Sequence, residues 1–158
     1  MRWHRMMLRL GGKMMFRAYI KDTDDLDYND VPHKGHFVYG NLIEGGNQSN
    51  TDAIVGDLIE ATDEYINPEW WCSIEKGSAE QSTGLKDANG KDIYEGDIVK
   101  SSYKYAQPKI SQVIMEDGNS YILGEDLATG NEMLVSDHIN EIEVIGNIHT
   151  NRLSIAIT

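Results

Sequence analysis

The run from Ser82 to Lys100, STGLKDANGKDIYEGDIVK, constrains the fold more than any other part of the chain. It places two tight-turn signals and short apolar segments within nineteen residues. Asn89-Gly90 is the strongest short signal for a β-hairpin, because a type I′ turn needs a positive φ at both central positions. Glu95-Gly96-Asp97 predicts a second reversal, which leads into the apolar pair Ile98-Val99. The run therefore predicts strand, turn, strand, turn, strand, and it indicates a fold but no reaction.

The rest of the second half continues this β pattern. Asp117-Gly118-Asn119 is a further hairpin signal between two apolar segments, and Ser136 can cap one helical turn that ends near Asn140. The expected strands are Ile110–Glu116, Ser120–Leu123, Met133–Val135 and Ile142–Ile148. Strands that recur every 8–12 residues with turns between them predict a small barrel or a sandwich.

The first half is also β-rich but less regular. Its expected strands are Phe16–Ile20, His36–Ile43, short strands within Ala53–Ile59, Tyr65-Ile66 and Trp70–Ile74. We expect residues 14–80 to form a β-rich region, residues 81–150 the barrel, and residues 151–158 a tail. The predicted fold is therefore mainly β, with one or two short helical turns.

Two polar segments contain residue types that can bind a metal. The five aspartates of residues 21–30 lack the glycine and the glutamate of an EF-hand loop, since Asp27 and His33 stand at those positions. His33 and His36 could share a metal, but no third ligand lies nearby in the sequence. We therefore expect a solvated loop, a turn after Pro32, and neither a metal nor another cofactor.

Composition limits the location and the chemistry. The single Cys72 excludes an internal disulfide and a multi-cysteine zinc site, and it favours a reducing, cytoplasmic location. Because Cys72 lies in the aromatic segment Trp70–Ile74, we expect a small buried side chain and not a nucleophile. No apolar run approaches the roughly 18 residues of a membrane span.

Charge divides the chain at Met14. The first 13 residues carry Arg2, Arg5, Arg9 and Lys13 and no acid, whereas the rest has 10 basic and 26 acidic side chains. Gly11-Gly12-Lys13 can be encoded by a purine-rich ribosome-binding sequence, which favours a natural start at Met14 or Met15. A disordered arm and a basic amphipathic helix are the alternatives for residues 1–13.

Four segments together resemble the YopX family of bacteriophage and prophage proteins. They are Thr83–Asp87, Asn89–Lys91, Ile93–Val99 and Glu143–Ile148, and the opening Met15–Tyr19 looks like the N-terminal strand of that family. The resemblance implies a mostly β protein with an SH3-like barrel in its C-terminal half, and self-association. It implies no catalytic activity, so no functional residue is carried over.

The main functional hypothesis is a non-enzymatic accessory protein that binds a host or phage protein. No catalytic triad, metal cluster or paired-carboxylate motif is visible, and Asp92, Glu95 and Asp97 are expected to be solvated in turns. An alternative is acidic mimicry of DNA by the body of net charge −16 that follows residue 13.

A second alternative is nucleic-acid binding, since small barrels often bind nucleic acid through basic side chains and stacked aromatics. The acidic balance of the chain opposes it. The candidate residues are Lys86, Lys91, Lys100, Lys104 and Lys109 with Tyr94, Tyr103 and Tyr105.

Overall fold

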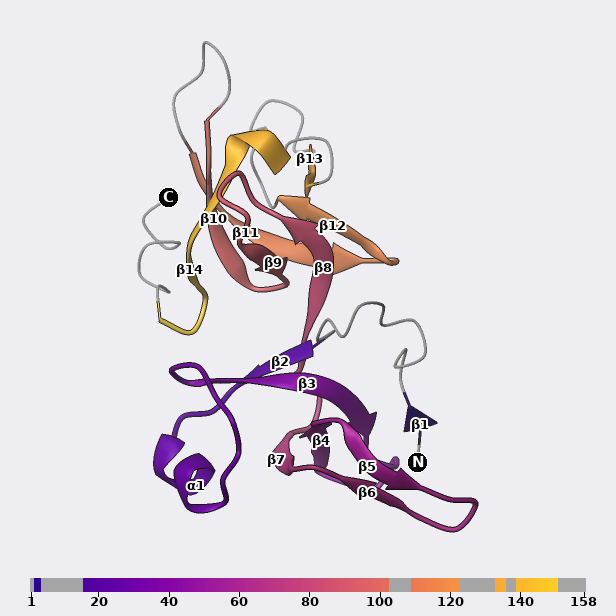
Figure 1. The fold of residues 1–158 in the computed structure, drawn as a ribbon. Coiled ribbons are helices and arrows are strands. Elements are labelled where there is room, and N and C mark those ends of the chain that lie inside the picture. The colour runs from indigo at the N-terminus through magenta and orange to yellow at the C-terminus, as the bar shows by residue number, and fades with distance from the viewer. Residues whose placement is uncertain (1, 4–15, 103–108, 123–132, 136–138, 151–158) are drawn as a thin grey trace. The chain divides into compact units, whose positions relative to one another are not determined.

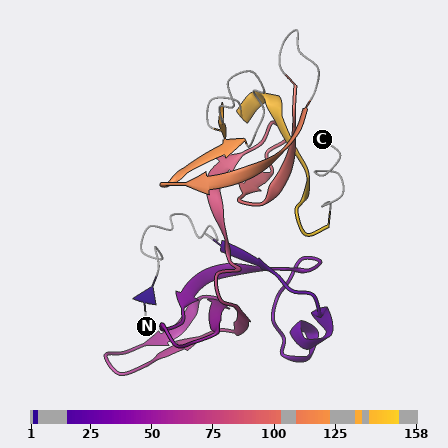
Figure 2. The ribbon, with the colours of Figure 1, turned by 180° about the vertical axis from the view of Figure 1, so that it is seen from behind.

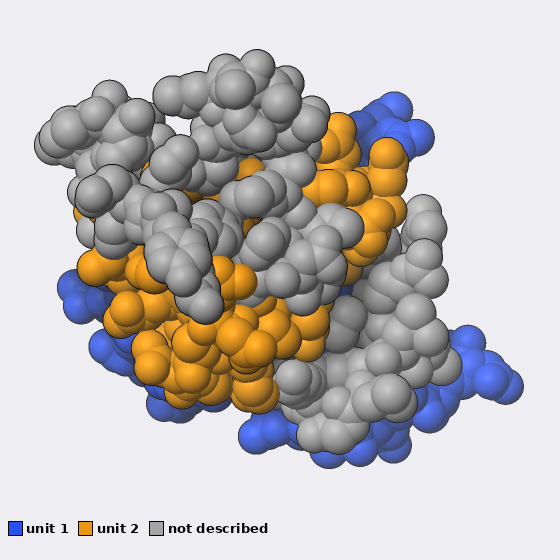
Figure 3. Space-filling model, turned by 90° about the horizontal axis from the view of Figure 1, so that it is seen from above, with its two compact units in different colours: residues 1–80 blue, residues 81–158 orange. Residues whose placement is uncertain are grey.

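The computed structural model describes residues 2–3, 16–102, 109–122, 133–135 and 139–150 (Figure 1). These residues are mainly in β-strands, which confirms the predicted fold class. The chain divides into two compact units, unit 1 with residues 1–80 and unit 2 with residues 81–158 (Figure 3).

Apart from β1, the strands of unit 1 overlap the segments that the sequence predicts. Four of them form an antiparallel series in the order β7-β4-β3-β2, and β1 also pairs with β3. β5 and β6 form a separate two-stranded hairpin, which Figure 2 shows from behind. The bounds are β1 Arg2–Trp3, β2 Phe16–Tyr19, β3 Phe37–Glu44, β4 Thr51–Val55, β5 Leu58–Ala61, β6 Ile66–Pro68 and β7 Trp71–Glu75.

One face of this sheet carries the hydrophobic core of unit 1. Ala18 pairs with Val38 and Leu42 pairs with Ile54, so alternate residues of neighbouring strands project to the same side. These four side chains are buried in one cluster, together with Ile74. The alternation seen in the sequence therefore has its expected cause, the burial of one face.

The same core is covered by helix α1, Thr23–Tyr28, where the sequence predicted a solvated loop. Asp22 caps the helix, because its side chain accepts a hydrogen bond from the Asp24 N–H at 3.0 Å. Asp30 has a φ of +55°, and the Val31 N–H donates to the Leu26 carbonyl at 2.8 Å, which is a Schellman end. The loop prediction was wrong because Leu26 is the one buried residue of this six-residue helix, and a single buried position gives no visible periodicity.

Unit 2 contains a five-stranded sheet and a hairpin. The sheet order is β13-β12-β11-β10-β14, and β8 pairs with β9. Its core is the buried cluster of Ile93, Val99, Val113, Ile122 and Ile142, with Val135 and Val144. The bounds are β8 Glu80–Lys86, β9 Asp92–Tyr94, β10 Asp97–Ser101, β11 Lys109–Glu116, β12 Asn119–Ile122, β13 Met133–Leu134, the 3₁₀ turn η3 Ile139–Glu141 and β14 Ile142–Asn147.

The closed SH3-like barrel predicted for this half is not what the described strands form. β13 and β14 lie at opposite ends of the sheet order and do not pair with each other within the described residues. Closure requires a ladder between the first and last strands. The two residues of β13 offer few backbone groups for such a ladder, so the described sheet is open.

The Asn89-Gly90 hairpin is confirmed, but its predicted turn type is wrong. Gly90 has a φ of +82°, whereas Asn89 is not among the described residues with a positive φ. The Gly90 N–H donates to the Asp87 carbonyl at 3.0 Å, so the turn begins earlier than a type I′ turn centred on Asn89-Gly90 would. The Asp87 side chain accepts hydrogen bonds from the N–H groups of Asn89 and Lys91, which stabilises this longer turn.

The Asp117-Gly118 hairpin has the geometry that was expected at Asn89. Asp117 and Gly118 have φ values of +52° and +84°, and Glu116 pairs with Asn119 across the two-residue loop. Positive φ at both positions is the type I′ pattern. The hairpin predicted between the two apolar segments is therefore confirmed.

Some predictions fall outside the described residues. They are residues 4–13 of the basic N-terminal segment, positions 136–138 of the expected helical turn, and the tail 151–158. Arg2 and Trp3 pair with Glu44 and Ile43 of β3. The three interpretations of residues 1–13 stay predictions.

Candidate functional site

The edge strand β7 is exposed along most of its length. Among the described strands it pairs only with β4, so one side of its backbone has no strand partner. Trp71, its first residue, is 61% exposed, although tryptophan is a residue that folding usually buries. An open strand edge beside an exposed aromatic ring is a typical surface for a second chain.

Trp70 is held in place by two glycines. A Cβ at Gly56 would lie 2.5 Å from the indole Nε1, and a Cβ at Gly40 would lie 3.2 Å from the indole Cη2. The Gly56 N–H also donates to the Trp70 carbonyl at 3.0 Å. The indole therefore packs against the backbone at these two glycines and is partly buried against the core.

A groove with a volume of about 970 Å³ lies between α1 and the segment of β6 and β7. Its lining includes the acidic residues Asp22, Asp25, Asp30 and Glu69, and no lysine, arginine or histidine. No described side chain pairs with the carboxylates of Asp25, Asp30 or Glu69. The remaining lining residues are Ile20, Leu26, Asn29, Val31, Ile66, Asn67, Pro68, Trp70, Trp71, Cys72 and Ser73.

Helix α1 positions the acidic wall of this groove. Leu26 is 3% exposed and packs into the core, which fixes the rotation of the helix. The Asn29 side chain donates to the Asp25 carbonyl at 2.8 Å and closes the last turn. The packing of Leu26, together with that of Val31 just after the helix, therefore holds Asp22 and Asp25 at the groove.

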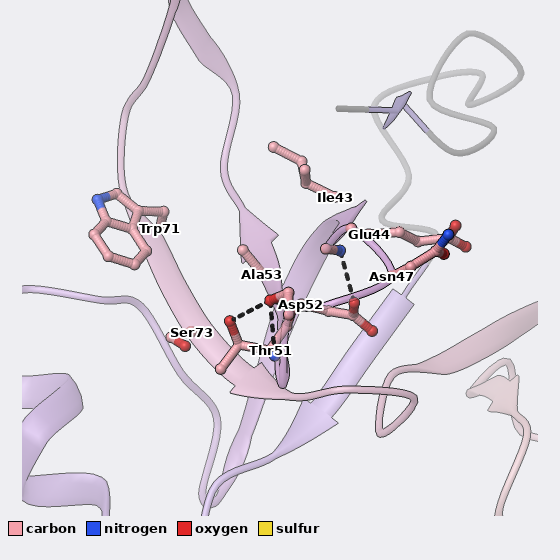
Figure 4. Close-up of a pocket in the computed structure, with 11 residues that line it drawn as sticks. Ile43, Glu44, Asn47, Thr51, Asp52, Ala53, Trp71 and Ser73 are labelled. Atoms are coloured by element: carbon pink, nitrogen blue, oxygen red, sulfur yellow. Dashed lines mark hydrogen bonds between the residues drawn. The ribbon is translucent and has the colours of Figure 1, made fainter.

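A second hollow, of about 570 Å³, lies on the β3–β4 side of the same edge (Figure 4). Trp71 and Ser73 line both cavities, so β7 borders the two of them. At this hollow the Asp52 carboxylate accepts hydrogen bonds from Gly45 N–H at 2.8 Å and Gly77 N–H at 2.9 Å. Burial alone would raise the pKa of Asp52, but these hydrogen bonds and the nearby Lys76 ammonium lower it. Asp52 thus fixes two loops and is not available to a ligand.

Cys72 packs as a small apolar residue, as the sequence predicted, but it is not fully buried as was also predicted. Its side chain is half-buried and packs against the core of unit 1. Burial raises the pKa of the thiol, and a protonated thiol is a poor nucleophile.

The β5–β6 hairpin adds exposed apolar surface to unit 1. Ile59 is 67% exposed and Tyr65 is 53% exposed. The Tyr65 hydroxyl donates to Glu60 at 2.6 Å, which holds the ring against its own hairpin. Residues 35–75 contain eight acidic side chains and no lysine or arginine, so this apolar surface has an acidic surround.

The predicted nucleic-acid residues lie only partly within the described chain. Lys86 forms an ion pair with Asp92 at 3.0 Å, and Lys100 is exposed opposite Glu143 in the strand register. Lys91 is exposed at the hairpin turn. Tyr94 is 7% exposed, so its ring offers no open face for a base. Tyr103, Lys104 and Tyr105 and the side chain of Lys109 lie outside the described residues.

His33 and His36 have structural partners. The two ring nitrogens of His33 lie 2.7 Å from Asp27 Oδ1 and 2.7 Å from the Gly35 carbonyl, and these hydrogen bonds raise its pKa. His36 Nδ1 lies 2.8 Å from the Ile20 carbonyl. No group of three possible metal ligands occurs within the described part of the chain.

Asp97 corrects the expectation that the acids of the Glu95–Asp97 turn are solvated. It is 2% exposed and accepts a hydrogen bond from the Tyr94 N–H at 2.8 Å. A buried carboxylate that accepts a backbone hydrogen bond stabilises the turn itself. Its place in the fold is structural.

Comparison with known proteins agrees with the resemblance seen in the sequence. The family described as YopX protein matches residues 15–153, which is most of the chain. The chain belongs to the YopX family. Curated proteins gave no match. Of the helices in the described residues, none has the length and apolar character needed to cross a membrane.

A solved structure supports the fold of this YopX-family chain. The crystal structure of protein EF1440 from Enterococcus faecalis is similar to it, with a TM-score of 0.51 and 26% sequence identity. The similarity covers 89% of this chain and 96% of that chain, so it includes both units. The likeness concerns the fold, and no ligand or activity is carried over from it to this chain.

Proposed function

We propose that this YopX-family protein is a non-enzymatic accessory protein of bacteriophages and prophages that acts in the bacterial cytoplasm by binding another protein through the β7 edge of unit 1. The exposure of Trp71 is the observation that carries the proposal. Aromatic side chains are enriched at protein interfaces, and a few of them supply most of the binding free energy. Trp71 lies on an open strand edge and borders two cavities.

The surroundings of Trp71 support the same proposal. The neighbouring Trp70 is fixed by Gly40 and Gly56, so part of the surface is formed before a partner arrives. A preformed surface loses less conformational entropy on binding. The nucleic-acid alternative gains no comparable support, because Lys86 is paired and Tyr94 is buried.

Capture from lysogenic host cells tests the proposal. Tagged wild-type protein should retain a host or phage protein that Trp71→Ala loses by about tenfold or more. The matched control is Ile145→Ala, which removes a 43% exposed apolar side chain from unit 2 and should leave capture unchanged. Equal capture by all three proteins would contradict a role for the β7 edge.

Self-association is the second part of the proposal, and it rests on the family resemblance. Light scattering of the full chain measures the molecular mass in solution. A monomeric mass at all concentrations would remove self-association from the proposal and leave the binding of another protein in place.

A further inference from the structure

We propose that the groove between α1 and β7 binds an extended, basic segment of a partner protein, which adds to the sheet as a strand beside β7. This inference rests on the proposed function, since it names the chemistry of the partner at the same edge. Three properties of the groove support it: its shape, its charge and its aromatic wall.

The shape favours an extended ligand. One wall of the groove is formed by eight consecutive residues, Ile66 to Ser73, and the opposite wall by α1 and the residues that flank it. The last part of the long wall is β7, whose outer side has no described strand partner. A segment that lies between a helix and an open strand edge can hydrogen-bond to that edge along its main chain. The volume of about 970 Å³ is at the upper end of the range for ligand sites.

The charge favours lysine or arginine side chains on that segment. Asp25, Asp30 and Glu69 line the groove, and no described side chain neutralises their carboxylates. Two of them lie at one wall and Glu69 at the other, so a cation between the walls would meet negative charge from both sides. Complementary charge across an interface increases both the association rate and the specificity.

The aromatic wall suits the same ligand. Trp70 and Trp71 are consecutive lining residues, and Trp71 is 61% exposed. An indole face attracts an ammonium or guanidinium group and also packs against the aliphatic stem of a lysine or arginine. A second copy of this chain is a poorer occupant, because the chain after residue 13 carries 26 acidic and 10 basic side chains.

The test uses the full-length protein and three synthetic eight-residue peptides. The first alternates lysine and valine, the second alternates glutamate and valine, and the third is the lysine–valine peptide with N-methyl groups on alternate amides. We expect the lysine–valine peptide to bind with a Kd below about 1 mM by calorimetry, more weakly as salt increases. The N-methylated peptide should bind at least about tenfold more weakly, because strand addition needs its N–H groups.

Two double variants assign the site. The double variant Asp25→Asn with Glu69→Gln should bind the lysine–valine peptide about tenfold more weakly than the wild type. Asp63→Asn with Glu64→Gln removes the same charge from the exposed turn between β5 and β6 and should leave binding within about twofold. A variant that lacks residues 1–13 should bind the lysine–valine peptide as tightly as the full chain does. Tighter binding by this variant would show that the chain's own basic segment occupies the groove. That result would overturn the inference.

Other results would also overturn the inference. These are no binding of the lysine–valine peptide, equal binding of the glutamate–valine or N-methylated peptide, and equal losses in the two double variants. If the peptide fails while Trp71→Ala still abolishes capture of a host protein, the proposed function holds and only this inference falls. If the peptide binds as expected but Trp71→Ala captures the partner as well as the wild type does, the groove binds basic strands. The captured partner then does not bind at the β7 edge.

Discussion

The described residues of the two units differ in the apolar side chains that they expose. Unit 1 carries Tyr28, Ile59, Tyr65 and Trp71, which are between 53% and 87% exposed, whereas the large exposed apolar residue described in unit 2 is Ile145, at 43%. Both units nevertheless contain a buried carboxylate that accepts hydrogen bonds from loop N–H groups, Asp52 in unit 1 and Asp87 in unit 2. Unit 1 therefore keeps large apolar side chains exposed that its core does not bury. We propose that binding occurs at this exposed apolar surface.

Most of the segments that carry the family resemblance lie in unit 2. The run from Ser82 to Lys100 forms β8, β9 and β10, and its acids stabilise turns. A segment can therefore reveal a family through the requirements of its turns while the candidate binding surface lies elsewhere. Four predictions test this division, from the largest expected effect to the smallest.

Asp87→Ala should destabilise unit 2 by about 3 kcal/mol. The Asp87 carboxylate is buried and accepts hydrogen bonds from the N–H groups of Asn89, Lys91 and Val144, which would lose their partner. Urea unfolding followed by circular dichroism measures the loss. Asp92→Ala, which breaks an exposed pair with Lys86, is the control and should cost less than about 1 kcal/mol. Equal losses would mean that Asp87 does not hold this unit together.

Gly56→Ala should destabilise unit 1 by about 1–3 kcal/mol, because its methyl group would collide with the Trp70 indole. The Trp70 indole would have to move away from residue 56, so the tryptophan fluorescence of the folded variant should change as well. Gly46→Ala is the control, since a Cβ there meets nothing within 4 Å and the residue has no positive φ. An unchanged spectrum in Gly56→Ala would show that Trp70 is not fixed by this contact.

The stability of both units should fall in acid. The pKa values of Asp52 and Asp87 are lowered because, although burial opposes ionisation, backbone hydrogen bonds to each carboxylate outweigh it. A lowered folded-state pKa adds stability above the unfolded value of about 3.9, and this stability is lost as the pH falls through the folded value. Unfolding free energies measured between about pH 2 and pH 7 should show the decline, and Asp52→Asn should show less of it.

His33 should produce the smallest effect, with the opposite sign. Its pKa is raised, so its contribution to stability is fully present below about pH 6.5 and is lost as the pH rises through the folded value. NMR titration should give a pKa above the ordinary value. Asp27→Asn should bring it back down, because Asp27 Oδ1 is the partner of His33 Nε2. A titration that is insensitive to this change would exclude the pair.

The strands of this fold could be predicted from the sequence because each depends on local alternation. Asp117-Gly118 was correctly assigned because a two-residue loop fixes the register by itself. The turn at Asn89-Gly90 was assigned with the wrong geometry, since the decisive Asp87 side chain lies outside the two-residue motif. The open sheet of unit 2 was missed because pairing between distant strands leaves no periodic signal.

The candidate site could not be predicted because it depends on α1 and β7 meeting across the groove. The sequence predicts that Asp22 and Asp25 lie in a solvated loop. Only the burial of Leu26, which determines the rotation of α1, shows that these two residues line the groove. Trp70 and Trp71 are neighbours in the sequence, and only the structure shows that the Trp70 ring is partly buried and the Trp71 ring is exposed. The run from residue 35 to residue 75 without a lysine or arginine was a visible signal that could have directed attention to this unit.

The most direct test of the account is hydrogen exchange of this YopX-family protein in complex with a partner captured from host cells, compared with the free protein. We predict slower exchange at Trp71, Cys72 and Ser73 of β7 and unchanged exchange in β8 and β9. Protection that is confined to unit 2, with β7 exchanging as in the free protein, would contradict the assignment of binding to the edge of unit 1.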